Sequence, residues 1–323
     1  MRIVIVGAGS LGSVIGGLLG RAGHQVTLVT RNVAHVAAIA RAGGVWLDDG
    51  VNTALGPVVA TSSYDEVGVA DLAIVLVKSF DTVDAVRAAL PVIGDRTVVL
   101  SLQNGVGCEE LITGVVGRDR VVAGRTFIGG RLIEPGVVEF GAAGRLTTIG
   151  ELATPSSNGA GGGVGDKGGR VDALAEEFSR AGIATSVSAD IRVTMWEKLF
   201  VNVATGAWSA LTGLPYGELS VEPHVVEAAI ATVAEAMVVA RALGVAVTTT
   251  DPSVPWRQAW EGLPYGFKAS MLQSIEKGSR TEVDVIHGAV CRGGQEAGVL
   301  TPINDTLLAA VKGVERRLAL TAE

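Results

Sequence analysis

The sequence of 323 residues predicts an α/β domain with appended antiparallel strands over residues 1–188, followed by an all-α domain over residues 189–323. Three observations lead to this prediction. Short apolar runs alternate with helical patterns through the first half of the chain. Gly- and Pro-containing turns separate strand-like segments at 120–152, and strand patterns largely disappear after residue 188. A chain of this length can bury a core in each of two domains.

The first thirty-one residues predict a strand, a glycine-rich turn, a helix and a second strand. A β-branched run at 3–6 leads directly into a G-x-G-x-x-G turn, which indicates a Rossmann-type dinucleotide-binding unit rather than a merely structural turn. The first glycine permits a tight turn, the second lets phosphates approach the backbone, and the third allows close packing of helix on strand. The N-terminus of the helix offers N–H groups and a positive dipole end to the anion. The expected cofactor-binding residues of the turn are Gly7, Ala8, Gly9, Ser10, Leu11 and Gly12.

Arg31 follows the second predicted strand and indicates which dinucleotide binds. Units that bind NAD usually carry an acidic residue there, which accepts the ribose hydroxyl, whereas an arginine suits a 2′-phosphate. The alternative is a solvated loop arginine, but no acidic residue lies nearby in the sequence to take the ribose. The sequence therefore predicts NADP(H) as the cofactor.

The rest of the first half continues the alternation that is typical of a doubly wound sheet. Antiparallel hairpins are expected at 120–152, and the low-complexity residues 155–169 are expected to form a surface loop of unknown role. Strands are predicted at 72–77, 97–102 and 183–187, and helices at 33–41, 82–90, 109–116 and 171–181.

Helical patterns account for the second half. Asp190 is a candidate N-cap, and Thr301 with Pro302 begins the last helix. The Ala-rich helix at 225–243 fits either a homodimer interface or the core of the helical domain. The predicted helices span 190–205, 225–243, 259–277 and 281–297, with a last one from 301 onward.

Composition and charge exclude several classes of partner. The net charge of −7 argues against nucleic acid or an anionic membrane surface. Apolar stretches are interrupted before they reach the length of a membrane span, and no signal peptide is recognisable. Cys108 and Cys291 lie far apart, the four histidines are scattered and no C-x-x-C occurs, so we expect a cytoplasmic protein with reduced thiols and no metal site.

The helix at 190–205 carries a candidate proton donor. Lys198 and Asn202 are four residues apart and share one helix face beside an apolar stripe. Desolvation can tune a lysine for proton transfer, although an exposed helix lysine is the alternative. Lys78 and Asn104 follow predicted strands, and the carboxyl ends of strands in such sheets are where ligands bind.

Six motifs in order resemble one known family over nearly the whole chain. They are GAGSLG with Arg31, VKSF at 77–80, QNGVG at 103–107, WEKLFVN at 196–202, KASMLQ at 268–273 and TEVDVIHG at 281–288. With these motifs the chain resembles ketopantoate reductase (2-dehydropantoate 2-reductase), a family of NADPH-dependent enzymes of pantothenate biosynthesis. The resemblance implies reduction of a 2-oxo acid to a 2-hydroxy acid.

The resemblance also implies residue roles. Lys198 would be the general acid that protonates the C2 oxygen, and Glu282, on a helix facing it, would hold the substrate hydroxyl or the cofactor ribose. Asn104 and Asn202 would orient substrate and nicotinamide, Ser270 would donate to the substrate carboxylate, and Lys78 would neutralise negative charge. Lys78, Asn104 and Glu282 are expected to contact the cofactor as well.

The chain departs from the family pattern at three positions. Gly206 and Phe267 stand where asparagines often occur, and Ser274 replaces a usual aspartate. The substrate pocket has thereby lost polar partners, and its tryptophans suggest either a more apolar pocket or ordinary core packing. Fold and reaction type therefore carry over better than the substrate. Two alternatives remain: a reductase of another small oxo acid or ketone, and a non-catalytic NADP(H)-sensing protein.

Overall fold

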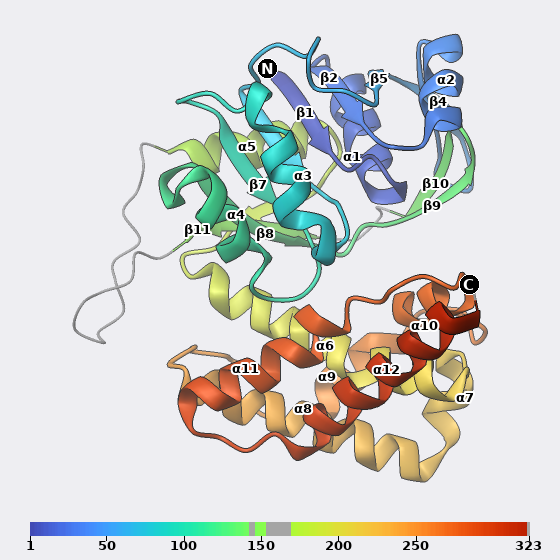
Figure 1. Cartoon of the computed structure of the whole chain (residues 1–323), viewed down its shortest axis with the longest axis vertical. Coiled ribbons are helices and arrows are strands. Elements are labelled where there is room, and N and C mark those ends of the chain that lie inside the picture. Colours follow the sequence, from blue (N-terminus) through green and yellow to red (C-terminus); the bar gives the residue numbers. More distant parts are fainter. Residues whose placement is uncertain (142–145, 153–168, 322–323) are drawn as a thin grey trace. The chain divides into compact units, whose positions relative to one another are not determined.

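The computed structural model describes residues 1–141, 146–152 and 169–321 and divides the chain into two compact units (Figure 1). Unit 1 comprises Met1–Gln103 and Cys108–Ile191, and unit 2 comprises Asn104–Gly107 and Arg192–Glu323. The division at 191/192 lies close to the boundary at 188/189 that the sequence predicts. Most of the predicted Gly-rich surface loop, residues 155–168, lies outside the described residues.

The described residues of unit 1 form an eight-stranded sheet in the order β12-β11-β8-β7-β6-β1-β2-β5. Its neighbouring strands are parallel except for the antiparallel pair β8 and β11. The predicted α/β class is confirmed. The strands are β1 (Arg2–Val6), β2 (Gln25–Val29), β5 (Val59–Thr61), β6 (Leu72–Val75), β7 (Val98–Ser101), β8 (Val121–Thr126), β11 (Thr147–Glu151) and β12 (Thr185–Val187).

Helices cover both faces of this sheet. In β1, Ile3 and Ile5 belong to one apolar cluster and Val4 and Val6 to another, because successive side chains of a strand point to opposite faces. Burial on both faces explains why these strands are continuous apolar runs. The helices are α1 (Ser10–Arg21), α2 (Val33–Ala42), α3 (Thr82–Ala88), α4 (Cys108–Val116) and α5 (Arg170–Arg180), with 3₁₀ turns η1 (Ser79–Asp81), η2 (Leu90–Val92) and η3 (Arg118–Arg120).

The described residues also form a second sheet of four strands, in the order β4-β3-β10-β9. The sequence did not predict this separate sheet. The expected hairpin at 120–152 exists in β9 and β10, but β10 pairs with β3 instead of extending the large sheet. The expectation of hairpins appended to the large sheet is therefore wrong for this pair, because its partner strand β3 lies about ninety residues earlier in the chain. The strands are β3 (Gly44–Asp48), β4 (Thr53–Pro57), β9 (Gly129–Glu134) and β10 (Val137–Gly141).

A buried histidine ties this second sheet to α1 and α2. Nδ1 of His35 accepts a hydrogen bond from the backbone N–H of Gly136 at 2.9 Å, so Nε2 carries the proton of the neutral ring and faces the hydroxyl of Ser13, also at 2.9 Å. Burial lowers the pKa of His35, which favours this neutral form. The β9–β10 turn is thus held against the helix that follows the glycine-rich turn.

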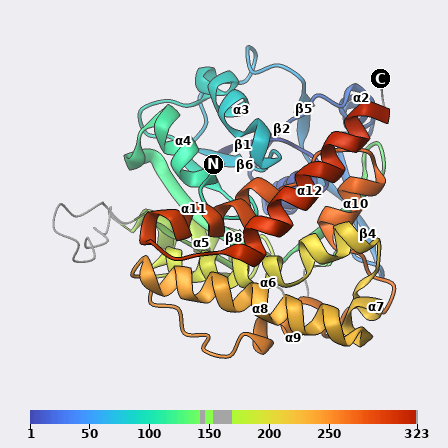
Figure 2. The same ribbon diagram turned by 60° about the horizontal axis from the view of Figure 1, so that its bottom comes forward.

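The described part of unit 2 is helical, as predicted. α8 buries its Ala-rich face and packs against α11 and α12 (Figure 2), so this helix serves the core of the unit. The helices are α6 (Ile191–Thr212), α7 (Tyr216–Val221), α8 (Pro223–Ala242), α9 (Ser253–Trp260), α10 (Ser270–Glu276), α11 (His287–Ala297) and α12 (Pro302–Thr321), with the 3₁₀ turn η4 (Val283–Val285).

Two predicted helices are interrupted. The helix expected at 259–277 is wrong, because α9 ends at Trp260 and α10 begins only at Ser270; Gly262, with φ +75°, and Pro264 lie in the break. The helix expected at 281–297 begins only at His287. There the Thr281 hydroxyl accepts a hydrogen bond from the N–H of Val283 at 3.2 Å, a local contact that competes with helix formation.

Crossing a membrane would need a longer and more apolar helix than any that the structure describes. Among the described residues no group of three or more His, Cys, Asp or Glu side chains is placed to hold a metal ion. Cys108 and Cys291 are buried and are not joined in a disulfide.

Candidate active site

The glycine-rich turn between β1 and α1 is shaped by contacts that leave no room for side chains. A Cβ on Gly7, whose φ is +97°, would lie 2.6 Å from the backbone N of Val77, and a Cβ on Gly12 would lie 2.6 Å from the carbonyl O of Gly7. Gly9 instead has open space around its Cα, and it precedes α1 without a side chain that could cap the helix. A narrow turn, an open middle glycine and an uncapped helix N-terminus fit a bound phosphate.

Ser10, the first residue of α1, connects this turn to the second sheet. Its Oγ accepts a hydrogen bond from the N–H of Leu132 at 3.0 Å, so its own hydroxyl proton is directed elsewhere and can be donated to a phosphate oxygen. Ala8 is buried and Leu11 packs against the core of unit 1. These two residues therefore contribute backbone groups rather than side-chain contacts.

Arg31 lies just beyond β2, where an acidic partner was not foreseen. Its guanidinium donates to Oδ2 of Asp81 at 2.8 Å, while 90% of its side chain is exposed. Asp81 lies in η1, beyond the carboxyl end of β6. Sequence reasoning missed Asp81 because fifty residues separate it from Arg31.

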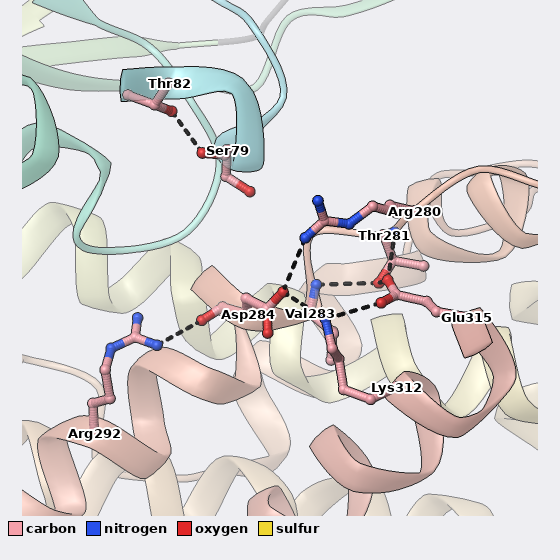
Figure 3. Close-up of polar contacts among 9 residues, drawn as sticks. All are labelled: Ser79, Thr82, Arg280, Thr281, Val283, Asp284, Arg292, Lys312 and Glu315. Atoms are coloured by element: carbon pink, nitrogen blue, oxygen red, sulfur yellow. Dashed lines mark hydrogen bonds and ion pairs between the residues drawn. The ribbon is translucent and has the colours of Figure 1, made fainter. Parts of the chain in front are cut away.

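Lys78 precedes η1 in an extended conformation, with φ −61° and ψ 145°. The segment that carries it is fixed by Gln103, whose Nε2 donates to the carbonyl O of Val77 and to Oγ1 of Thr82, both at 2.8 Å. Thr82 in turn donates to the carbonyl O of Ser79 (Figure 3). Gln103 stands in the QNGVG motif, and its position directly after a predicted buried strand is the signal that could have identified its role.

In unit 2, the structure brings Lys198 and Asn104 together. Lys198 lies in α6, and its Nζ donates to Oδ1 of Asn104 at 2.9 Å across ninety-four positions of sequence. Asn104 can donate through its Nδ2, because its Oδ1 already accepts from the lysine. A cation and an amide donor thus lie side by side.

Asn202, one turn further along α6, carries a buried polar atom without a protein partner. Its Nδ2 has no hydrogen-bond partner among the described residues. An unsatisfied buried donor costs about 1–3 kcal/mol, and such donors are rare outside sites where a ligand or water accepts the bond. Asn202 and Lys198 share a face of α6, so this donor points to the same region as the lysine.

The Asn104 segment is docked on the segment that carries Glu282. The N–H of Val106 donates to the carbonyl O of Val285 at 3.0 Å, and a Cβ on Gly105, whose φ is +88°, would lie only 2.4 Å from that carbonyl O. Glu282 is 8% exposed and precedes η4. The expectation that Glu282 lies on a helix is therefore wrong: a short turn carries it.

The positions that depart from the expected pattern lie near α10. The nearest atom to a Cβ on Gly206 is Cε of Met271, at 3.4 Å, and the ring of Phe267 stacks on Tyr216 with centroids 5.8 Å apart. Ser270, the first residue of α10, is exposed, whereas Ser274 is buried and its hydroxyl donates to the carbonyl O of Ser270. Ser274 therefore serves its own helix.

The tryptophans noted in the sequence serve the core. Trp256 is buried, and Trp208 and Trp260 pack partly buried against the helical core. Core packing, the second of the two roles considered for them, accounts for their positions.

These features define a class. A parallel sheet with a glycine-rich turn at the first helix is the architecture of dinucleotide-dependent oxidoreductases, and the helical unit adds a lysine held by an asparagine.

Comparison with known proteins narrows the class to one family. The family model described as ketopantoate reductase PanE/ApbA matches residues 3–154, and that of its C-terminal domain matches residues 190–315. The 2-dehydropantoate 2-reductase of Halobacterium salinarum is 36% identical over 98% of this chain and 99% of its own length. That of Archaeoglobus fulgidus is 33% identical over 98% and 99%. The chain belongs to the ketopantoate reductase family of oxidoreductases.

Two solved structures show the same fold. A PanE/ApbA family ketopantoate reductase from Ralstonia eutropha superposes with a TM-score of 0.85 at 32% identity, covering 99% of this chain and 100% of that one. A D-mandelate dehydrogenase solved with NADH and anilino(oxo)acetate superposes with a TM-score of 0.86 at 25% identity, with the same coverage. The fold therefore occurs in enzymes named for different 2-oxo or 2-hydroxy acids.

Proposed function

We propose that this protein reduces a 2-oxo acid to a 2-hydroxy acid with NADPH, and that 2-dehydropantoate, reduced to pantoate, is its leading substrate. The observation that carries the proposal is the 2.9 Å hydrogen bond from Lys198 Nζ to Asn104 Oδ1. A positive charge and an amide donor held together suit a carbonyl oxygen that becomes negative as it is reduced. The names of the relatives and the retained motifs support the same assignment.

A Cβ on Gly7 or Gly12 would collide with neighbouring backbone, so only glycine fits at these two positions. This is the packing that the glycines of a dinucleotide-binding turn require. When bound, the nicotinamide supplies the hydride that reaches C2 of the substrate. The N–H groups at the start of α1 would hold the pyrophosphate, and Arg31 would bind the 2′-phosphate. Lys78 and Glu282 would contact the cofactor or substrate.

Lys198 acts at the carbonyl oxygen. Its ammonium polarises the C2 carbonyl and then transfers a proton to that oxygen as negative charge develops. Asn104 fixes the ammonium by accepting a hydrogen bond from it, and Asn202 supplies to the substrate its Nδ2, which has no partner in the described part of the chain. Ser270 donates to the substrate carboxylate.

The test measures turnover of a panel of 2-oxo acids. Purified protein is mixed with NADPH and each acid, NADPH absorbance is followed, and wild type is compared with Lys198→Ala and with Lys277→Ala, an exposed lysine of the same unit. We expect the wild type to turn over at least one acid and Lys198→Ala to lose at least about 100-fold in rate, the scale of general acid catalysis. The rate of Lys277→Ala should equal that of the wild type. Absence of turnover with every acid would instead favour the NADP(H)-sensing alternative.

A second candidate substrate class, 2-oxo acids with bulky apolar groups, is supported by the departures at α6 and α10. The nearest atom to a Cβ on Gly206 is Cε of Met271 in α10, and the ring of Phe267 stacks on Tyr216. The glycine removes a side chain and the phenylalanine adds an apolar surface. Faster turnover of an aromatic 2-oxo acid than of 2-dehydropantoate in the same panel would select this candidate.

A further inference from the structure

The backbone on the N-terminal side of Glu282 is bound by a carboxylate of the last helix. Oε1 of Glu315, in α12, accepts hydrogen bonds from both the backbone N–H and the hydroxyl of Thr281, at 2.6 and 2.7 Å (Figure 3). The Thr281 hydroxyl oxygen also accepts the N–H of Val283 at 3.2 Å. Both neighbours of Glu282 are therefore fixed, directly or through one hydroxyl, by a single carboxylate.

Lys312, one turn earlier on α12, holds the C-terminal side. Its Nζ donates to Oδ2 of Asp284 at 2.9 Å and also lies 3.0 Å from Oε2 of Glu315 (Figure 3). Arg292 of α11 donates to the backbone carbonyl of Asp284 at 3.0 Å. The turn that carries Glu282 is thus anchored at both ends to α12 and once to α11.

This network is buried at Thr281 and Glu315 and half-exposed at Lys312 and Asp284. The side chains of Thr281 and Glu315 are nearly inaccessible, at 1% for the residue Thr281 and 9% for the Glu315 side chain. Burial alone would lower the pKa of Lys312, but its contacts with Asp284 and Glu315 outweigh that cost and raise the pKa above its ordinary value. The lysine therefore stays charged, and it compensates the buried carboxylate of Glu315.

Neither Glu315 nor Lys312 belongs to the motifs that suggest the reaction, and the core of unit 2 does not account for their contacts. The buried apolar face of α12 is formed by Leu307 and Val311, whereas Lys312 and Glu315 turn to the 281–285 segment. Glu315 accepts two hydrogen bonds from Thr281 and lies 3.0 Å from Lys312 of its own helix, so its contacts are directed at the segment that carries Glu282.

We infer that Glu315, assisted by Lys312, is a positioning residue that sets the place of the Glu282 carboxylate for the reduction. The inference rests on the proposed function, because it assumes that Glu282 contacts the substrate or the cofactor. Glu315 acts through the Thr281 backbone and hydroxyl, which fix the φ and ψ of the residues on either side of Glu282. A displacement of about 1 Å in a reacting group can cost roughly 100-fold in rate.

The experiment is a double-mutant cycle of Glu315→Ala with Glu282→Gln, measured on the best 2-oxo acid. We expect Glu315→Ala to lower kcat by about 10- to 100-fold in the wild-type background. In the Glu282→Gln background it should lower kcat less than about twofold, because a residue that acts only through another has no further effect once that one is removed. Equal loss in both backgrounds would overturn the inference, since a merely structural role lowers both alike.

Further variants separate positioning from folding. Glu315→Gln keeps an oxygen that can accept from Thr281 and should recover most of kcat, whereas Thr281→Val should resemble Glu315→Ala. The matched carboxylate control is Glu296→Gln on the exposed face of α11, which should leave kcat unchanged. If Glu315→Ala does not fold, the same cycle is run with Thr281→Val, and additive effects there would overturn the inference.

The outcomes distinguish this inference from the proposed function. A wild-type protein that turns over none of the 2-oxo acids refutes the proposed function and leaves the cycle without a baseline rate; in that case hydrogen exchange at the Thr281 amide decides. Exchange of this amide should be faster in Glu315→Ala than in Glu296→Gln. Equal exchange would contradict the claim that Glu315 holds the Thr281 backbone. If the wild type turns over a 2-oxo acid and Glu315→Ala has the same kcat, only the inference about Glu315 is refuted.

Discussion

Replacement of Asp81 by asparagine should strengthen the binding of NADPH. The guanidinium of Arg31 is held by Asp81 at 2.8 Å, so a 2′-phosphate has to compete with this carboxylate for the arginine. Asparagine removes the negative charge and keeps the size of the side chain. Both the competition for Arg31 and the repulsion of the phosphate are then reduced.

The exposure of the pair limits the size of the effect. The side chains of Arg31 and Asp81 are 90% and 33% exposed, and exposed ion pairs contribute about 0.2–1 kcal/mol. Asp81→Asn should therefore lower the Kd of NADPH by roughly 1.4- to 5-fold, and the gain should shrink at high salt as screening weakens all these charges. The Kd of NADH, which lacks the phosphate, should stay within about twofold.

Fluorescence titration of both cofactors at low and high salt measures these constants. Glu139→Gln, which breaks the exposed ion pair of Glu139 with Arg131 in the second sheet, is the matched control and should change neither constant. Weaker NADPH binding in Asp81→Asn, or an equal gain for NADH, would refute the competition. Arg31→Ala should weaken NADPH alone, and equal affinities in wild type would contradict a 2′-phosphate role for this arginine.

Two further substitutions address the helical unit. Gly105→Ala should lower the free energy of unfolding, measured in urea, by about 1–3 kcal/mol and should also reduce turnover, because the φ of Gly105 is +88° and a Cβ there would meet the carbonyl O of Val285. The control is Gly114→Ala in α4, where a Cβ has open space around it; this change should lower neither the stability nor the turnover. Burial lowers the pKa of His287 to about 4, below its ordinary 6.5, so the unfolded state binds the extra proton first and stability should fall as the pH drops from 6.5 towards 4, by up to about 3 kcal/mol. The urea midpoint should depend less on pH in His287→Asn than in wild type, and its dependence should be unchanged in His224→Asn. An unchanged pH dependence in His287→Asn would show that another group is responsible.

Local patterns predicted the fold where it is built from neighbours in the chain. The run at 3–6, the glycine turn and α1 form a unit whose contacts are short-range, and the helical second half follows from its 3.6-residue periodicity. The second sheet escaped prediction because β3 pairs with β10, about ninety residues later, and no local pattern specifies such a partner. The helix expected at 281–297 failed because side-chain contacts of Thr281 outweigh the helical pattern around it, whereas the break in the helix expected at 259–277 contains Gly262 and Pro264.

The candidate site divides in the same way. Lys198, Asn104 and Glu282 could be named from motifs, but motif spacing is silent on the distant partners that hold Lys198 and the residue before Glu282. Asp81 on Arg31 and Glu315 on Thr281 are pairings of single side chains across fifty and thirty-four positions, and these have no periodic signature. The cytoplasmic location and the homodimer stay predictions.

The positions that keep the family pattern and those that depart from it have different contacts. The residues for the reaction are therefore separate from those for the choice of substrate. Lys198 is held by Asn104, and the Asn104 segment is held by the turn that carries Glu282. The nearest atom to a Cβ on Gly206 is instead Cε of Met271, and the ring of Phe267 stacks on Tyr216. An apolar pocket discriminates weakly between similar side chains, whereas loss of a hydrogen-bonding group changes selectivity strongly. Gly206→Asn together with Phe267→Asn should therefore shift turnover towards the more polar 2-oxo acid while Lys198→Ala still abolishes it; an unchanged ratio between substrates would place the selectivity elsewhere.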